Sequence, residues 1–536
     1  MEQPLAIPRD PRIPASRLAR LLRPSFSDLF FLSLLSWLFL TSPDGFNSLL
    51  LDGDTGWHIR TGDYILSHGH VPRVDIFSFS KPGHEWFAWE WGADIIYSLL
   101  HRTWGLKGVA WLGGLQIVLF ATVLFRYTLW RGANMIWAMM VGLLAIGAST
   151  VHYLARPHLF TLLLLPICVW ILEADRRRPS KLIWLTVPLT MAWTNLHGGV
   201  LAWVACVGIY AAGLAVETLL AEGDGRDWSG VKRHFGLLFL TSAATLANPY
   251  GWNLHLHVAA YLRSDFIREA IQEFQSPTFR NENQLQYEAL LLVGLMAAAV
   301  ALSRRRVVEA LLIVFWAHQS LGSIRHITVF STLASPIIAE EATRLWRWWV
   351  SRAGKKSTRG ILEAMASDMR PSFAWTSMWP AVGALALLMV GGLPFKWPAD
   401  FPDFRFPVKL VNKHEAQLRS GRLLTTDQWA DYLIYRFYPS QRVFFDGRSD
   451  FYGAELGREY MRLSGGSHDW RQILERYQFD HALVPVGWSL ASLLKEDKSW
   501  RLLDDDGKTL FFERIAGKQP VATGPRQNFP RPALMN

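Results

Sequence analysis

Residues 51–91 read LDGDTGWHIRTGDYILSHGHVPRVDIFSFSKPGHEWFAWEW, and they follow directly after a strongly apolar stretch at 27–50. The segment is rich in acidic, histidine and tryptophan residues. Its first carboxylates, Asp52 and Asp54, stand just ahead of His58. Ionisable groups at the membrane boundary are costly and are typical of functional sites. The loop is therefore the first candidate for a site whose chemistry takes place at a membrane surface.

The composition is that of a membrane protein. Of the 536 residues, 50% are hydrophobic and 26 are Trp, and the apolar residues gather in runs long enough to cross a bilayer. The two cysteines, Cys168 and Cys206, both lie in such runs, so the chain has no disulfide framework and no Cys-x-x-Cys metal site. The patterns of nucleotide hydrolases, dinucleotide-binding proteins, and serine or zinc peptidases are missing, so these classes lack support.

Hydropathy predicts an α-helical polytopic membrane protein with about eleven transmembrane helices. The expected spans are about 27–50, 106–126, 134–152, 158–174, 182–194, 198–219, 235–248, 286–303, 307–319, 326–343 and 374–394. Lys and Arg gather in alternate loops, as cytoplasmic loops require. The net charge of +10 is therefore mainly a topology signal, and no nucleic-acid partner is needed to explain it.

These signals divide the chain along its length. No small-residue cleavage site follows the basic N-terminus, so we expect a retained first helix and no cleaved signal peptide. An odd number of helices places the two ends of the chain on opposite sides of the membrane. The expected parts are a basic cytoplasmic N-terminus (1–26), a transmembrane domain (27–396) with a first outer loop (51–105), a periplasmic α/β domain (397–516) and a disordered tail (517–536).

The α/β domain is predicted from short strand-like runs separated by helical patterns. The runs lie at 421–426, 442–446, 481–485 and 509–515. The sequence Asp446-Gly447-Arg448-Ser449-Asp450 predicts a tight turn after the second run, with a calcium loop or a sugar contact as the alternative. Trp429 and Tyr452 either dock the domain over an outer cavity as an acceptor-binding lid or belong to a purely structural cap.

Polar side chains recur where the expected helices meet the outer loops. The sequences are HYLARPH (152–158), TNLHGG (194–199), NPYGWNLHLH (248–257) and SIRHI (323–327). Ionisable groups at such depths usually line a cavity. Arg156, Arg325 and Arg263 would bind a phosphate there if they converge, because a guanidinium presents a planar fork of donors. The alternative for each arginine alone is an interfacial anchor to lipid headgroups.

These features together resemble the GT-C superfamily of polyprenyl-phosphate-sugar-dependent glycosyltransferases. Within it, the first outer loop resembles that of a bacterial group with the pattern Asp-x-x-Trp-His, Gly, Pro-x-x-Asp-x-Phe-Ser, Trp, Glu-Trp. The residues in those places are Asp54, Trp57, His58, Gly62, Pro72, Asp75, Phe77, Ser78, Trp86, Glu90 and Trp91. ARPHLFT, WTNLHGG, ANPYG and RVFFDGRSDFYG look like the same group, so the resemblance covers most of the chain.

The resemblance implies transfer of a sugar from a polyprenyl-phosphate-linked donor lipid to a glycan, lipid or protein acceptor, at the periplasmic face of a bacterial inner membrane. Such a reaction needs a base for the acceptor proton and positive charge beside the departing phosphate. Asp54 is the expected base of an inverting transfer. Related mannosyl- and aminoarabinosyltransferases carry an adjacent Asp-Glu pair, whereas this chain has Asp-Gly-Asp, so Asp52 stays open as the key residue.

The remaining candidates follow from the same chemistry. Arg156, Arg325 and His326 are expected to bind the donor phosphate. Asp52, Asp54 and His58 are catalytic candidates, and they are also the candidate ligands of a divalent cation (Mg, Mn or Zn). Expected acceptor or sugar contacts are Asp75, Trp86, Glu90, His158, Asn195, His197 and Asn248.

Plainer interpretations also remain open. Asp54 is a favoured residue for the N-cap of a helix at 55–67. The tryptophans of the first loop are equally typical of an interfacial aromatic belt. A polymerase or ligase that uses a lipid-linked glycan shares the donor class with a single-sugar transferase. A transporter or a nonenzymatic assembly protein of envelope glycan synthesis is the alternative from another class.

Overall fold

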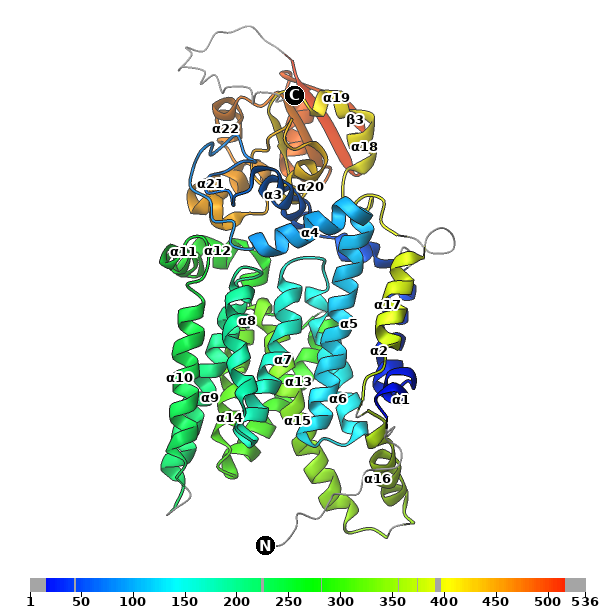
Figure 1. Cartoon of the computed structure of the whole chain (residues 1–536). Helices are drawn as coiled ribbons and strands as arrows, with labels where there is room; N and C mark the ends of the chain where they lie inside the picture. Colours follow the sequence, from blue (N-terminus) through cyan, green and yellow to red (C-terminus); the bar gives the residue numbers. More distant parts are fainter. Residues whose placement is uncertain are drawn as a thin grey trace.

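The computed structural model of the chain describes residues 16–42, 45–222, 226–280, 282–354, 356–373, 375–390 and 397–515. Most of the expected basic N-terminus and the whole expected tail at 517–536 lie outside the described residues. Long helices run side by side as a bundle, and an α/β domain covers one end of it (Figure 1). Between the two lie α3 (Asp54–His68), α4 (Trp91–Trp104), α11 (Trp252–Arg263) and α12 (Asp265–Ala270).

The helices of the bundle lie between residues 17 and 389 of the chain. They are α1 (Arg17–Leu22), α2 (Phe26–Thr41), α5 (Leu106–Arg131), α6 (Met135–Ala148), α7 (His158–Arg177), α8 (Thr186–Thr194), α9 (Val200–Leu220), α10 (Trp228–Ala244), α13 (Glu282–Ser303), α14 (Val307–Gly322), α15 (Ile327–Val350) and α17 (Trp379–Met389). At the end away from the α/β domain, α16 (Thr358–Met369) follows α15 (Figure 1).

Six of the described helices are long and apolar enough to cross a membrane, which makes the chain a multi-pass membrane protein. They are Arg17–Thr41, Leu106–Arg131, Met135–His152, His158–Arg177, Val200–Leu220 and Gln284–Ser303, and Val307–Gly322 and Trp379–Met389 are shorter apolar helices. Each expected span contains a helix, but the number eleven is not confirmed. Three helices in expected spans belong to neither set. The helix α8 has 9 residues, α10 has 17 residues and contains Lys232 and Arg233, and α15 contains Glu340 and Glu341.

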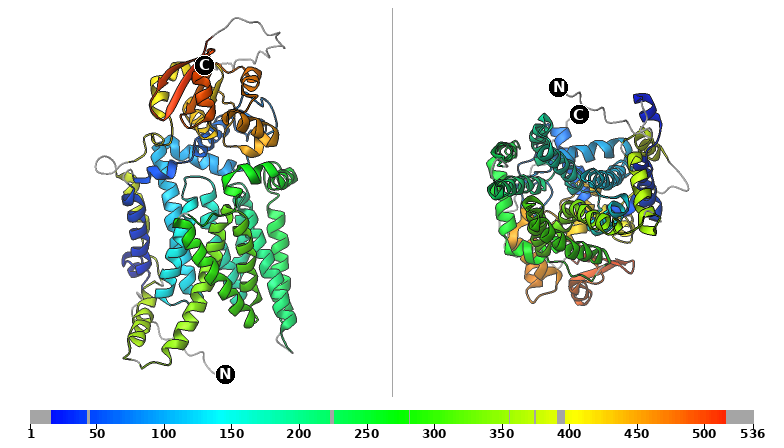
Figure 2. Two further views of the ribbon diagram at one scale, coloured as in Figure 1. Left: turned by 180° about the vertical axis from the view of Figure 1, so that it is seen from behind. Right: turned by 90° about the horizontal axis from the view of Figure 1, so that it is seen from below.

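The start of α2 shows how local sequence signals build the bundle. Ser25 and Asp28 form a capping box, in which each side chain accepts the backbone N–H of the other residue, at 3.1 and 2.7 Å. Asp28 also accepts the backbone N–H of Ser377, 3.1 Å away, just before α17. This contact joins α2 to α17, and both helices run along one side of the bundle (Figure 2).

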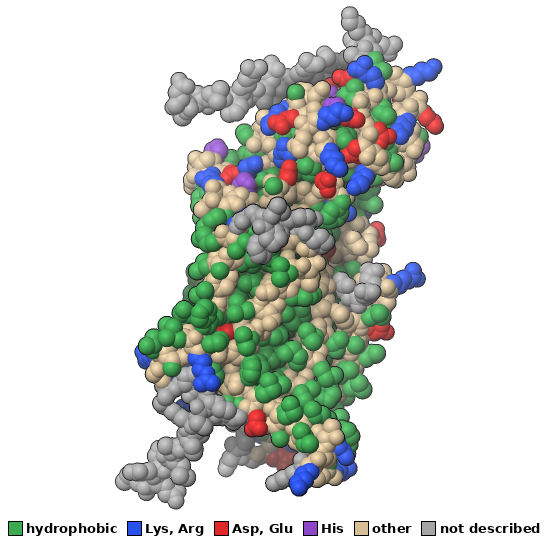
Figure 3. Space-filling view, turned by 90° about the vertical axis from the view of Figure 1, so that its right-hand side faces the viewer, with side chains coloured by type: hydrophobic (Ala, Val, Ile, Leu, Met, Phe, Trp, Pro, Cys, Tyr) green, Lys and Arg blue, Asp and Glu red, His purple; other side chains and the backbone are tan. Residues whose placement is uncertain are grey.

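The outer surface of the bundle is apolar. On the face shown in Figure 3, hydrophobic side chains cover the middle of the molecule, and charged side chains gather toward its two ends. This distribution matches the hydrocarbon core and the two polar boundaries of a bilayer.

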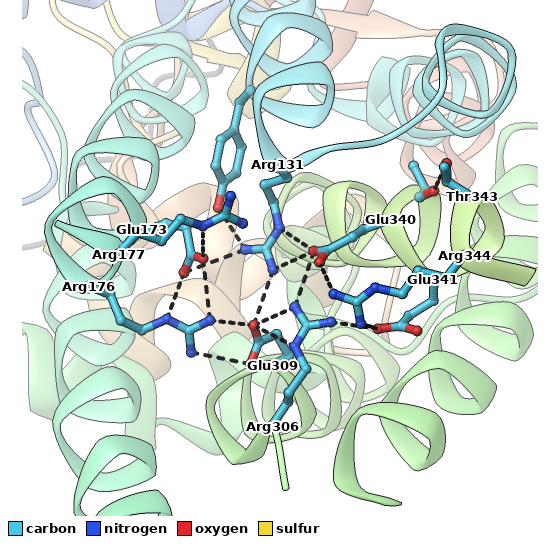
Figure 4. Close-up of polar contacts among 12 residues, drawn as sticks. Arg131, Glu173, Arg176, Arg177, Arg306, Glu309, Glu340, Glu341, Thr343 and Arg344 are labelled. Atoms are coloured by element: carbon cyan, nitrogen blue, oxygen red, sulfur yellow. Dashed lines mark hydrogen bonds and ion pairs between the residues drawn. The ribbon is translucent and has the colours of Figure 1, made fainter. Parts of the chain in front are cut away.

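Buried ion pairs join four helices at the end away from the α/β domain (Figure 4). Arg131, the last residue of α5, lies 3.2 Å from Glu309 of α14 and 2.9 Å from Glu340 of α15. Arg176 of α7 lies 2.5 Å from Glu309. Arg306 pairs with Glu309 and Glu340 at 2.7 and 3.1 Å. The arginines that mark the expected cytoplasmic loops are therefore also structural ties between helices.

The α/β domain is built on a four-stranded sheet with the order β1-β2-β4-β3. Its strands are β1 (Leu423–Thr425), β2 (His481–Pro485), β3 (Trp500–Asp505) and β4 (Thr509–Arg514). β1 is parallel to β2, and β4 is antiparallel to β2 and β3. The helices are α18 (Val408–Lys413), α19 (Glu415–Leu418), α20 (Asp427–Phe437), α21 (Ser449–Ser464), α22 (Trp470–Tyr477) and α23 (Ser489–Glu496).

Two strand expectations need correction. The run at 442–446 does not join the sheet, because Val443 pairs with the first outer loop instead: Phe79 donates its N–H to Val443 O at 2.9 Å, and Val443 donates to Phe77 O at 3.0 Å. β3 was not expected. It forms because a turn at 505–508 folds WRLLDD back onto the apolar strand β4.

The domain is fastened to α3 by close backbone contact. A Cβ added at Gly53 would lie 2.3 Å from the carbonyl oxygen of Gln428, and one at Gly56 would lie 2.7 Å from that of Asp431. Only glycine permits this approach of α3 to α20. The first outer loop and the α/β domain therefore form one packed layer over the bundle.

Candidate functional site

A cavity of about 530 Å³ lies where the bundle meets this layer. Its polar wall includes Asp54, Glu90, Asp94, His152, Arg156, His158, His197, Glu273, Arg325, His326 and Asp450. Farther along α7, α9, α14 and α15 the wall is apolar, with Leu162, Leu165, Leu201, Ala202, Phe315, Trp316 and Val329. The cavity thus presents charged groups above an apolar pocket, which suits a ligand with a polar head and an apolar body.

Asp54 is the first residue of α3, and its side chain faces the cavity. The N-cap residue is Gly53, and no side chain caps the helix. The backbone N–H of Asp54 is bonded instead to Oδ1 of Asp52, at 3.0 Å. The capping interpretation of the Asp54 carboxylate is therefore wrong, and that carboxylate faces the cavity.

Arg156 connects the acidic groups of this wall. Its guanidinium lies 2.8 Å from Asp52, 2.6 Å from Asp54 and 3.2 Å from Glu273. Arg325 approaches the other oxygen of Glu273 at 3.2 Å. Two arginines on different outer loops therefore converge, as expected, and Glu273 holds them together.

Burial raises the pKa of two cavity carboxyls to values near neutrality. Desolvation raises the pKa of Asp54 to about 7, against the lowering effect of Arg156. Desolvation likewise raises the pKa of Glu90 to about 8, again against Arg156. Groups that titrate near the working pH are suited to proton transfer.

Glu90 stands between two histidines. His58 Nδ1 and Asp94 Oδ1 are 2.6 Å apart, and His58 Nε2 lies 3.6 Å from Glu90. His197 Nε2 lies 3.5 Å from the other Glu90 oxygen. Since His197 Nδ1 accepts the N–H of Gly199 at 3.0 Å, the proton of its neutral ring is on Nε2, facing Glu90.

Each of the three side chains expected to share a metal ion has a protein partner in the structure. The Arg156 guanidinium lies against both Asp52 and Asp54, while His58 is engaged by Asp94 and Glu90. Within the described ranges there is no group of three or more His, Cys, Asp or Glu side chains placed to hold a metal ion. The positive charge that lies beside Asp54 is the Arg156 guanidinium.

The other expected site residues fall into two sets. Those that line the cavity are Trp86, Glu90, His158, His197, Arg325 and His326. Asp75, Asn195 and Asn248 hold loops in place: Asp75 pairs with Arg448 at 2.8 Å, Asn195 accepts Trp91 Nε1–H at 2.7 Å, and Asn248 accepts the N–H of Tyr250 at 2.8 Å. Arg263 is exposed and does not line the cavity.

The segment Gly447–Asp450 reaches the cavity wall, which the tight-turn interpretation missed. Arg448 holds it there. The buried guanidinium lies 2.7 Å from Asp446 and 2.8 Å from Asp75, and it stacks on Trp86 with 4.5 Å to the ring centroid. The expected turn is therefore a contact between the α/β domain and the site.

Several site residues were missed by sequence reasoning. They are Asp94, Glu273 and Asp431, whereas Arg448 and Asp450 belong to the stretch for which a sugar contact was the alternative to a turn. Asp94 carries a usable signal, because it lies one helical turn beyond Glu90 in the same loop. For Asp431 no local signal exists, since it lies in α20, far along the chain, and reaches the site by accepting the N–H of Gly447 at 3.0 Å.

No protein-family model matches the chain, and no curated protein matches its sequence. Solved structures are similar in fold. The Archaeoglobus fulgidus oligosaccharyltransferase tethered with an acceptor peptide containing the NVT sequon matches with a TM-score of 0.51 and 11% identity, over 87% of this chain and 69% of that one. The archaeal oligosaccharyltransferase AglB from the same organism, in complex with an inhibitory peptide and a dolichol-phosphate, gives 0.53 and 10%, over 86% and 69%. The chain therefore shares its fold with these two solved structures.

Proposed function

We propose that the chain is a membrane glycosyltransferase that moves a sugar from a polyprenyl-phosphate-linked donor to an acceptor at the outer, periplasmic face of a bacterial inner membrane. The observation that carries this proposal is the position of Asp54. A carboxyl whose pKa is raised to near neutrality lies beside Arg156, which Glu273 links to Arg325, at the head of an apolar pocket. A base, an anion site and a lipid-compatible wall are what this reaction requires.

The chemistry assigned to the chain is a direct displacement. The acceptor oxygen forms a bond to the anomeric carbon while the bond from that carbon to the phosphate oxygen breaks, and the electron pair leaves with the phosphate. Asp54 takes the acceptor proton. Arg156 and Arg325 neutralise the lipid phosphate, for which proton donation is unnecessary. Attack from the face opposite the phosphate inverts the anomeric configuration.

A second candidate is transfer of a whole lipid-linked oligosaccharide by a polymerase or ligase. It is favoured by the fold, since the two similar solved structures described above are oligosaccharyltransferases, one of them in complex with a dolichol-phosphate. Both candidates use a lipid phosphate in the same place. The size of the donor glycan separates them, so a test must offer both kinds of donor.

The test is a transfer assay with the purified chain in lipid. Radiolabelled polyprenyl-phosphate monosaccharides and a lipid-linked oligosaccharide serve as donors, and envelope fractions supply the acceptors, with and without chelator. Arg156→Gln should weaken donor binding by about tenfold or more, because a charge-assisted contact is lost. Arg263→Gln is the matched control, since Arg263 is exposed and outside the cavity.

The outcomes separate the candidates. Transfer of a labelled monosaccharide supports the single-sugar enzyme, and transfer of the oligosaccharide alone moves the assignment to the polymerase or ligase. Loss of transfer on chelation would assign a role to a divalent cation. No transfer from any donor, or equal loss in both arginine variants, would contradict the proposal and favour a transporter or assembly protein.

A further inference from the structure

Residues 344–369 form a helical hairpin at the end of the bundle opposite the cavity. The helix α15 continues past its neighbours α5, α6 and α7, and α16 turns back beside it (Figures 1 and 2). Glu363 of α16 ties this α15–α16 hairpin together. Its carboxylate accepts Trp346 Nε1–H at 2.9 Å and lies 3.3 Å from Arg347, and it also accepts the side-chain N–H of Asn134, before α6, at 2.5 Å. The hairpin is therefore fastened to the end of the bundle.

Each helix of the hairpin exposes an apolar face. Three large apolar side chains on each helix recur at spacings of three and four residues, which places them on one side of that helix. Between 37% and 66% of each side chain is exposed. They are Leu345, Trp348 and Trp349 of α15 and Ile361, Leu362 and Met365 of α16. An exposed apolar patch of this kind marks an interaction surface.

The hairpin is also basic. Residues 344–369 contain six Lys or Arg residues but only two acidic ones. Arg352 lies over the ring of Trp348, 3.8 Å from its centroid, and Arg359 lies over that of Trp349 at 4.2 Å. Arg359 also donates to the carbonyl oxygen of Trp349 at 3.5 Å. Positive charge thus lies directly beside the exposed tryptophans.

The boundary between the hydrocarbon and the lipid headgroups suits such a surface. Water would leave the apolar faces exposed, and the hydrocarbon core would make the arginines costly. Tryptophan rings and basic side chains are both favoured at the boundary, where the rings contact acyl chains and the charges reach the headgroups. At the lower end of the face shown in Figure 3, hydrophobic side chains lie next to Lys and Arg in this way.

We propose that the α15–α16 hairpin is a binding site for anionic lipid headgroups. The apolar faces enter the acyl boundary, and the guanidiniums of Arg352 and Arg359 bind headgroup phosphates through their planar donors. The excess of positive charge selects acidic lipids over zwitterionic ones. A lipid surface fits better than a protein partner, because Glu363 and Asn134 hold the hairpin at the end of the bundle, where the bilayer surface lies. The site does not depend on the proposed function, since the cavity is at the opposite end.

The first test measures where the hairpin lies, with a fluorescent probe on the purified full chain in vesicles. Met365→Cys carries an environment-sensitive dye, because Cys168 and Cys206 are buried. In vesicles of phosphatidylglycerol and phosphatidylcholine, its emission should shift to shorter wavelength, and lipids with a nitroxide at the acyl boundary should quench it. Lys498→Cys is the control, since it is exposed on the α/β domain and should report water. A probe at position 365 that reports water in these vesicles would overturn the site.

The second test measures the preference for charge. Nitroxide-labelled phosphatidylglycerol should quench the probe at position 365 more strongly than labelled phosphatidylcholine at the same mole fraction, and high salt should reduce the difference. Replacing Arg352 and Arg359 by Gln should lower the preference about fivefold for each arginine, because each basic residue near an anionic surface adds attraction. Equal quenching by the two lipids would overturn recognition of the anionic headgroup.

Two further double variants separate the arginines from general charge and from folding. Lys495→Gln with Lys498→Gln removes two exposed positive charges from the α/β domain and should leave the preference unchanged. Arg352→Lys with Arg359→Lys keeps the charge and should retain most of the preference, so its loss there would assign the effect to a change of fold and contradict the proposal. A Gln double variant that keeps the full preference would also contradict it.

Discussion

At the scale of single residues, Asp54 acquires its properties from neighbours that are distant in the sequence. Arg156 comes from the loop before α7, and Glu273 from the loop after α12. Asp52 is the only one of these neighbours that is close in the sequence. Its carboxylate accepts the backbone N–H of Asp54 and also pairs with Arg156. Burial raises the Asp54 pKa, and Arg156 limits the rise.

The pH dependence of transfer should report this balance. Transfer should increase with pH through about 7, because Asp54 must lose its proton to act as a base and its pKa lies at about 7. Asp52→Asn removes a negative charge that raises this pKa, so the acid limb of the rate profile should move to lower pH. A limb that stays in place or moves upward in Asp52→Asn would show that another group controls it.

Sequence patterns identified Asp54, Arg156 and Arg325 because each stands at a polar helix end or in a loop motif. They could not identify Glu273 or Asp431 as partners, because only the folded chain brings these residues together. Asp75, Asn195 and Asn248 illustrate the reverse error. Their polar side chains stand in motif-like loops but are used to hold those loops in place.

At the scale of helices, the ion-pair network opposite the site ties α5, α7, α14 and α15 together (Figure 4). Arg131→Met should lower the free energy of unfolding by about 3–5 kcal/mol, because it leaves Glu309 and Glu340 buried with less compensation. Thermal or denaturant unfolding measures the change.

Arg305→Met is the matched control for Arg131→Met. Arg305 is 65% exposed and pairs with Glu222, which is 89% exposed, so its loss should cost less than about 1 kcal/mol. Equal effects of the two substitutions would show that the network adds no stability beyond that of a surface pair.

The contact between α3 and α20 should be equally sensitive. Gly56→Ala should destabilise the chain by about 1–3 kcal/mol, because its Cβ would lie 2.7 Å from the carbonyl oxygen of Asp431. Gly142→Ala in α6 is the control, since a Cβ there meets nothing within 4 Å and alanine favours a helix. A Gly56→Ala protein as stable as the control would mean that the two helices are not held this closely.

Helix positions were predictable because apolar runs and helix ends are local signals, and each expected span contains a helix. The pairing of the run at 442–446 was not predictable, because its alternating pattern fits any strand edge. That edge proved to be the first outer loop, at Ser78. The strand β3 was missed because it depends on two features together, the turn at 505–508 and pairing with β4. A hydropathy pattern shows neither.

At the scale of the whole molecule, we expect the α/β domain and the ion-pair network to lie on opposite sides of a membrane. The described cysteines, Cys168 and Cys206, are buried, so single introduced cysteines can report topology. In sealed inverted membranes, Arg178→Cys should react with an impermeant maleimide, while Lys498→Cys should react only after the membrane is opened. Both positions are exposed. The reverse pattern would place the site on the cytoplasmic side.

The membrane class was predictable from hydropathy and charge, and the GT-C resemblance agrees with the fold of the solved structures. The layer formed by the first outer loop and the α/β domain was not predictable, because it is made by close backbone contacts at Gly53 and Gly56. This layer is also what closes the cavity over Asp54, so the site belongs to the assembled molecule and to neither part alone.

The most direct measurement of the central claim is single-turnover transfer by Asp54→Asn, with donor binding measured on the same sample. The account predicts that the variant binds the polyprenyl-phosphate donor as the wild type does, because Arg156 and Arg325 are retained. It also predicts transfer that is slower by about 100-fold or more, because the base is lost. Transfer at the rate of the wild type would contradict the assignment of Asp54 as the base.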